Sequence, residues 1–109
     1  MGSQVIHADD VETQHGVFKP LTAQLGVAGF KLNQLALPAG QEGPEHDHSA
    51  NGEEEVYAVI AGGGVLRIDG KEVPLQPGHF VYCPPEARRQ MVAGSNGLTW
   101  IGIGSIDAA

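Results

Sequence analysis

The chain has 109 residues, of which 41% are hydrophobic, and this is enough to build the core of one domain. Thirteen acidic and six basic side chains give a net charge of −7, and the few cations are scattered along the chain. A clustered basic surface is absent, so we expect no binding to nucleic acid or to an anionic membrane surface. Sixteen Gly and seven Pro favour many short strands over a few long helices.

The sequence contains no run of 18 apolar residues, so no membrane-spanning helix is predicted. The first residues also lack the basic and then apolar segments that begin a secretory signal. Cys83 is the single cysteine, which leaves no intrachain disulfide and suits a reducing compartment. We therefore expect a cytoplasmic protein.

The first 16 residues are polar and are expected to form an N-terminal arm, followed by a single domain over residues 17–109. Within the domain, β-branched and aromatic runs alternate with Gly and Pro turn signals every 8–12 residues, a pattern typical of a β-sandwich or β-barrel. No stretch keeps a clean helical period, so the fold class is predicted to be all-β. The expected strands cover residues 30–37, 55–61, 65–68, 71–75, 79–83, 90–93 and 98–103, and residues 41–54 are the longest irregular stretch.

The irregular stretch carries the residues that indicate chemistry. His46 and His48 are one residue apart, so on an extended backbone both imidazoles point to the same side. Glu55 opens the next apolar strand and could add a carboxylate oxygen. Two His and one carboxylate form the set that binds a divalent transition metal and leaves coordination positions open. Alternatively, the His-x-His lies in a solvated acidic loop and binds nothing.

The spacing around these residues resembles the first motif of the cupin family, which is Gly, five residues, His-x-His, Glu, six residues, Gly. Here the motif covers residues 40–62, from Gly40 to Gly62. Six residues separate His48 from Glu55, where the family has three or four. Glu53 would fit this first distance but not the distance to Gly62, so Glu55 is preferred and Glu53 remains its rival.

Residues 70–96 resemble the second cupin motif, in which a Pro-Gly turn and a strand lead through Pro-Pro to a last ligand His. Pro77-Gly78 and Pro84-Pro85 stand at the expected places. The position of the last His is occupied by Arg89, whose guanidinium has no lone pair to donate to a metal. This departure puts the family's full ligand set in doubt.

The resemblance implies a small cupin, which is a jelly-roll-like β-barrel of two antiparallel sheets, with a pocket for a small organic molecule and a tendency to form homodimers. Three interpretations of the pocket stay open. In the first, His46, His48 and Glu55 hold Fe, Mn, Ni or Zn for an oxygenase, isomerase or lyase reaction, and Arg89 binds the substrate. In the second, no metal binds; Arg89 pairs with Glu55 or holds an anionic ligand in a binding or sensor domain. In the third, Arg89 points outward and the pocket is a vestige.

Two further residues are candidates for the pocket wall. Tyr57 shares a face with Glu55 on its strand. Asn33 and Gln34 lie on opposite faces of an otherwise apolar strand, so one of them faces inward, and Gln34 is taken as the pocket residue. The expected substrate-binding set is therefore Arg89, Tyr57 and Gln34; the substrate and the reaction are not identified by these residues.

Overall fold

The computed structural model describes residues 2–106 and has the expected all-β character. The strands that β-branched and aromatic runs predict are present, and a short 3-10 helix lies in the N-terminal arm. One short α-helix, which no helical period indicated, follows the first strand and ends at Gly26 in the left-handed conformation. In chain order the elements are η1 (Ala8–Asp10), β1 (Phe18–Pro20), α1 (Thr22–Leu25), β2 (Phe30–Leu37), β3 (Glu55–Ile68), β4 (Lys71–Leu75), β5 (Phe80–Cys83) and β6 (Arg89–Ser105).

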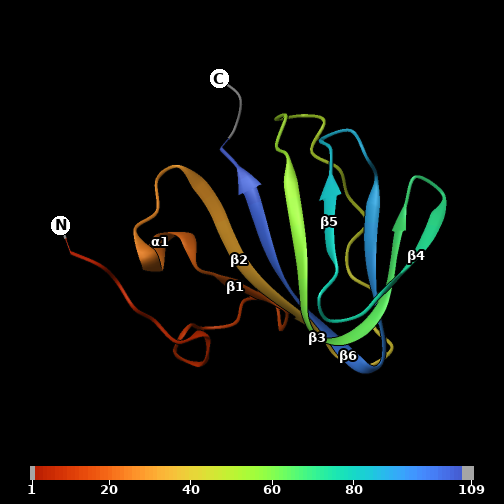
Figure 1. Ribbon diagram of the computed structural model, residues 1–109, viewed down its shortest axis with the longest axis horizontal. Helices are drawn as coiled ribbons and strands as arrows, with labels where there is room; N and C mark the ends of the chain where they lie inside the picture. The colour runs from red at the N-terminus through yellow and green to blue at the C-terminus, as the bar shows by residue number, and fades with distance from the viewer. Residues whose placement is uncertain (1, 107–109) are drawn as a thin grey trace.

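The strands pair in the order β1-β2-β6-β3-β4, with β5 also paired to β3, and every pairing is antiparallel. Strands β3 and β6 pair along almost their whole length, from Glu55 opposite Gly104 to Ile68 opposite Arg89. Both strands curve at the base of the molecule (Figure 1), so each contributes to both walls of the barrel. One wall contains β1, β2 and β5, and the other contains β4.

The two longest strands are a correction to the sequence-based boundaries. Residues 55–61 and 65–68 are one strand, as are 90–93 and 98–103, because the glycines between them bend the strands without ending them. The register of β3 on β6 shifts between Val59 and Ala61 and again between Gly62 and Gly64. Such irregularities let a strand turn the corner of a barrel.

Gly64 is required at this corner by the close approach of the two strands. A Cβ atom there would lie 2.1 Å from the carbonyl oxygen of Val92 on the neighbouring strand. Gly62 has the same restriction against the carbonyl oxygen of Gly97, and in addition has a φ of +72°. The bend therefore depends on glycine for space as well as for conformation.

The core lies between the two walls and continues up to the irregular segment of residues 41–54. Cys83 is completely buried in it, and burial raises the pKa of its thiol to about 11, so the group is an inert core residue. The main buried core residues are Leu37, Tyr57, Val59, Leu66, Leu75, Cys83, Met91, Ala93, Leu98 and Trp100.

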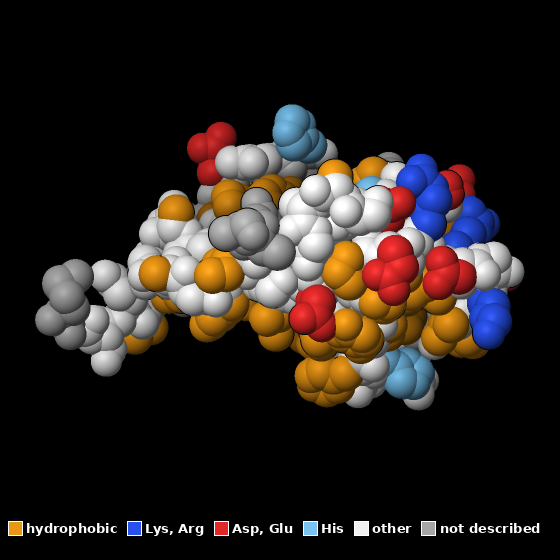
Figure 2. Space-filling model, turned by 90° about the horizontal axis from the view of Figure 1, so that it is seen from above, with side chains coloured by type: hydrophobic (Ala, Val, Ile, Leu, Met, Phe, Trp, Pro, Cys, Tyr) orange, Lys and Arg blue, Asp and Glu red, His pale blue; other side chains and the backbone are white. Residues whose placement is uncertain are grey.

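Several apolar side chains remain exposed on the outside of the barrel. Phe80 and Tyr82 on β5 are 74% and 55% exposed. Figure 2 shows hydrophobic side chains gathered along one long side of the molecule, with charged side chains beside them at the end away from the arm. The expected homodimer stays a prediction. Among the described residues, no helix is long and apolar enough to span a membrane.

Substituting Gly64 tests the account of the corner. Gly64→Ala places a methyl group against the Val92 carbonyl, so we expect the free energy of unfolding to fall by about 1–3 kcal/mol. Gly29→Ala is the matched control, because a Cβ atom at Gly29 meets nothing within 4 Å. Urea denaturation followed by circular dichroism measures both. Equal stability of the two variants would show that the strands can separate at the corner without cost.

Candidate metal and ligand site

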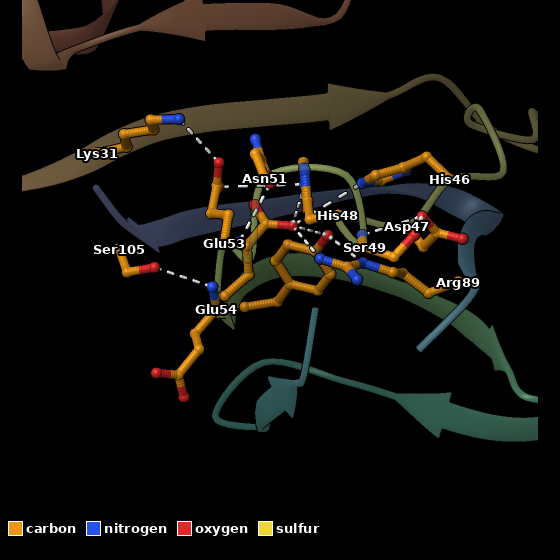
Figure 3. A network of polar contacts seen from close by, with 12 residues as sticks. Lys31, His46, Asp47, His48, Ser49, Asn51, Glu53, Glu54, Arg89 and Ser105 are labelled. Carbon is orange, nitrogen blue, oxygen red and sulfur yellow. Dashed lines mark hydrogen bonds and ion pairs between the residues drawn. The ribbon is translucent and has the colours of Figure 1, made fainter. Parts of the chain in front are cut away.

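The irregular segment of residues 41–54 is attached to the start of β6, and this attachment places the two histidines. The backbone of His46 pairs with that of Arg89 through two hydrogen bonds, each 2.9 Å, with each residue donating one. The N–H of His48 donates to the carbonyl of Pro85 at 2.8 Å. His46 and Arg89 are 43 positions apart in the sequence, and His48 and Pro85 are 37 apart, yet each pair is held side by side. Figure 3 shows His46, His48 and Arg89 gathered in one region.

Glu55 is the common partner of the polar groups in this region. One of its carboxylate oxygens, Oε1, lies 3.0 Å from His48 Nε2 and 3.8 Å from His46 Nε2. The same oxygen accepts a hydrogen bond from the Tyr57 hydroxyl at 2.8 Å and another from Arg89. Glu55 and Tyr57 are two residues apart at the start of β3, so the strand presents both on one face.

Arg89 points into the barrel, so the interpretation in which it faces solvent is wrong. Its side chain has no exposed surface. Nη2 donates to Glu55, Nε donates to the Tyr57 hydroxyl at 3.2 Å, and Nη1 donates to the carbonyls of Ala87 at 2.9 Å and Pro84 at 3.3 Å. These partners hold the guanidinium inside the protein, which does not favour its expected role of clamping a substrate carboxylate.

The ion pair determines the charge state of its members. Burial opposes ionisation of Glu55, but its polar contacts with His46, Tyr57 and Arg89 outweigh this effect and lower the pKa of Glu55 to about 2. The Glu55 carboxylate raises the pKa of His46, against the effect of burial. Burial raises the pKa of Tyr57 well above its usual range, so the phenol keeps its proton. The pair is therefore ionised and its hydroxyl partner is neutral.

A cavity of about 290 Å³ adjoins this cluster, and its wall contains most of the residues that the sequence singled out. The wall combines polar side chains with apolar and aromatic ones. The lining residues are Val17, Phe18, Lys31, Asn33, Leu35, Leu37, Gly43, Pro44, His46, His48, Glu53, Glu55, Tyr57, Arg89, Met91, Trp100 and Gly102.

Strand β2 places Asn33, and not Gln34, in the cavity wall, which corrects the expectation for Gln34. Asn33 is the register partner of Gly102, which also lines the cavity, whereas Gln34 pairs with Ile101 on the other face. Lys31 precedes Asn33 on the same face and was missed by sequence reasoning. The two-residue alternation of β2 predicts correctly which residues share a face, but it does not predict which face lines the cavity.

Glu53 is buried beside the cluster without joining it. Its Oε1 accepts a hydrogen bond from Lys31 Nζ at 2.9 Å, and its Oε2 lies 4.0 Å from His48 Nε2. The group of described residues that could hold a metal ion is His46, His48 and Glu55, whose ligand atoms all lie within 4.8 Å of one another. This geometry favours Glu55 over Glu53 as the carboxylate of a metal site.

The donor atoms therefore suit a divalent transition metal in kind and in number. The charge around the donor atoms opposes metal binding. Glu55 Oε1, the carboxylate oxygen of the set, already accepts hydrogen bonds from Arg89 and Tyr57. A cation placed there would lie next to the buried guanidinium and compete with it for Glu55. The cluster could hold a metal ion, with an affinity lowered by Arg89.

Removal of the guanidinium should be strongly destabilising. Arg89→Met leaves the Glu55 carboxylate buried without its cation, so we expect a loss of about 3–5 kcal/mol in the free energy of unfolding. Arg67→Met is the control, because Arg67 makes its ion pairs with Glu42 and Glu72 on the surface, where ion pairs contribute little to stability. Urea denaturation at pH 7 measures both variants, and comparable losses would contradict the central role of Arg89.

Acid unfolding provides a second check. Because the pKa of Glu55 is lowered to about 2 from its usual 4.5, its carboxylate adds stability that is present above pH 4.5 and lost as the pH falls to 2. Glu55→Gln should be less stable at pH 7 and should show a flatter decline in stability over this range. Glu86→Gln, at an exposed position, should keep the wild-type decline. The quantity to compare is the unfolding free energy between pH 5 and 2; identical slopes for all three proteins would refute the assignment.

Comparisons with known proteins agree with this architecture. The family described as "Cupin domain" matches residues 33–101. A cupin protein from Bacteroides fragilis is 26% identical, with a TM-score of 0.79 over 96% of this chain and 85% of that chain. A Cupin 2 conserved barrel domain protein from Salinispora arenicola is 22% identical, with a TM-score of 0.77 over 96% and 88%.

A putative sugar phosphate isomerase from Acidithiobacillus ferrooxidans is also similar, at 26% identity and a TM-score of 0.69, over 81% of this chain and 57% of that chain. No match was found among curated proteins. The match to the family extends over more than half of the chain and includes both histidines, Glu55 and Arg89. This chain belongs to the cupin family.

Proposed function

We propose that this cupin binds a small organic molecule in its barrel cavity without a metal ion, and that His46 and His48 make the polar contacts to the ligand. The observation that supports the proposal is the buried pair of Arg89 and Glu55 at the end of the cavity. It supplies a fixed positive charge at the position where related proteins would place the last metal ligand.

Charge balance is the physical basis of the proposal. Arg89 and Glu55 neutralise each other, and Glu55 Oε1 is engaged by Arg89, Tyr57 and His48. A divalent ion would add two positive charges beside a guanidinium that cannot lose its proton. The resting site is therefore stable without an ion.

Within the cluster of His46, His48, Glu55 and Arg89, the histidines are the most exposed side chains. Their side chains are 39% and 23% exposed, for His46 and His48 respectively, whereas Arg89 is sealed. The contact with Glu55 at 3.0 Å fixes the orientation of the His48 ring. An imidazole in this setting donates a hydrogen bond to a carbonyl, or accepts one from a hydroxyl. Proton transfer of isomerase or lyase type is the chemistry that such a pair adds to binding.

A second candidate function is that of a metal-dependent enzyme, and the proximity of the three donor atoms favours it. His46, His48 and Glu55 would hold Fe, Mn, Ni or Zn, which would supply Lewis-acid or dioxygen chemistry at its open positions. Similar structures include a putative sugar phosphate isomerase and a predicted oxalate decarboxylase, the latter from Thermotoga maritima.

Metal analysis separates the two candidates. We expect protein purified without an affinity tag or a chelator to contain far less than one equivalent of any first-row metal, and to take up none when Fe, Mn, Ni or Zn is added. Arg89→His restores a ligand and removes the charge, so this variant should bind added metal. Elemental mass spectrometry after gel filtration measures both proteins.

The opposite result has an equally clear meaning. Close to one equivalent of metal in the wild type, lost in the double variant His46→Ala/His48→Ala, would support the metal-dependent enzyme and refute the metal-free site. Circular dichroism of each variant shows whether the barrel is intact. Wild-type metal content in the double variant would exclude both histidines as ligands.

A further inference from the structure

We infer that the ligand of this cavity is an uncharged, mainly apolar molecule, and that Glu53 enforces this preference. The inference rests on the proposed metal-free function. It departs from the anionic ligand that an arginine in the pocket suggested, because the charges along the cavity wall are paired with one another.

Each cation in the described wall of the cavity faces a carboxylate that also lines it. Lys31 and Arg89 are the two cationic side chains of this wall. Lys31 Nζ donates to Glu53 Oε1 at 2.9 Å, and Arg89 donates to Glu55. The formal charges of these four side chains cancel, so the wall carries no excess positive charge to attract an anion.

The two carboxylates lie on either side of the ligand-facing His48. Its Nε2 is 4.0 Å from Glu53 Oε2 and 3.0 Å from Glu55 Oε1. In Figure 3 the ammonium group of Lys31 is turned toward Glu53. An anionic group that reached His48 would lie close to both carboxylates, and the protein's net charge of −7 repels anions as well. A neutral carbonyl or hydroxyl meets no such opposition.

The remainder of the wall determines the rest of the ligand. The volume of about 290 Å³ is at the lower end of small-molecule sites, which fits a compact molecule. Apart from its polar side chains, Asn33 among them, the wall is apolar, and burial of apolar groups against it is favourable. This part of the wall is formed by Val17, Phe18, Leu35, Leu37, Met91 and Trp100.

Glu53 is the residue that sets this selectivity. It is 5% exposed and is not one of the three candidate metal ligands. Its ion pair with a lysine or arginine, among the described residues, is the one with Lys31. Glu53→Gln keeps the shape of the side chain but removes its charge. The described wall of the cavity then lacks the carboxylate beside His48 and Lys31, and its net charge rises by one.

Benzamide and benzoate provide a direct test, because they have nearly the same shape and differ in charge. Trp100 is the chain's one tryptophan and lines the cavity, so its fluorescence reports on binding. Titrations use protein as purified, with known metal content, at pH 8, above the usual pKa of histidine. We expect benzamide to change the emission and to saturate, and benzoate to require at least a tenfold higher concentration.

Two variants locate the effect. Glu53→Gln should strengthen benzoate binding at least threefold and leave benzamide binding nearly unchanged. Gly102→Leu should abolish the benzamide response, because its side chain would fill the cavity. A Cβ atom at position 102 would lie 3.6 Å from Leu35 and 3.9 Å from Tyr57, which are ordinary van der Waals distances. The start of the new side chain therefore fits without displacing its neighbours.

Each outcome distinguishes the inference from the proposed function. Benzoate binding as tight as benzamide binding in the wild type, or no gain for benzoate in Glu53→Gln, would overturn the inference while the cavity remained the ligand site. Binding of neither compound up to its solubility limit, or benzamide binding that persists in Gly102→Leu, would overturn the proposed function and the inference together.

Discussion

The buried ion pair of Arg89 and Glu55 is the interaction on which the arrangement of this site depends. A guanidinium inside a protein is tolerated only when its donors are satisfied, and here the carboxylate, the Tyr57 hydroxyl and two backbone carbonyls satisfy them. These partners come from β3 and from the turn before β6. The backbone pairing of His46 with Arg89 then extends the constraint to the irregular segment, and so to both histidines.

The bend in the two long strands makes this pair possible. Glu55 begins β3, whereas Arg89 pairs in register with Ile68 at the far end of the same strand. In a flat sheet the two residues would be separated by the length of the strand. Because β3 and β6 turn at their glycine-rich corner, the ends of the strands approach each other across the barrel (Figure 1). The requirement for space at Gly64 thus has a consequence at the opposite end of the molecule.

In the proposed metal-free site, the arginine would also change what the cupin scaffold offers to a ligand. A metal ion attracts anions and polarises oxygen atoms, whereas a neutralised ion pair forms a polar part of the cavity wall without net charge. The second pair, between Lys31 and Glu53, repeats this balance on the β2 side of the cavity. A fold that hosts many reactions can in this way keep its barrel and its histidines while changing the class of molecule it accommodates.

The sequence by itself determined the all-β class, the family, and the grouping of His46, His48 and Glu55, because turn signals and motif spacing are local properties. It also placed Asn33 and Gln34 on opposite faces, but not which one lines the cavity, since a period of two does not define the inside. Only the tertiary structure decided that Arg89 turns inward to Glu55, that Lys31 pairs with Glu53, and that glycines bend two strands without ending them. Each of these depends on closure of the barrel, which brings together charges and backbones that lie far apart in the chain.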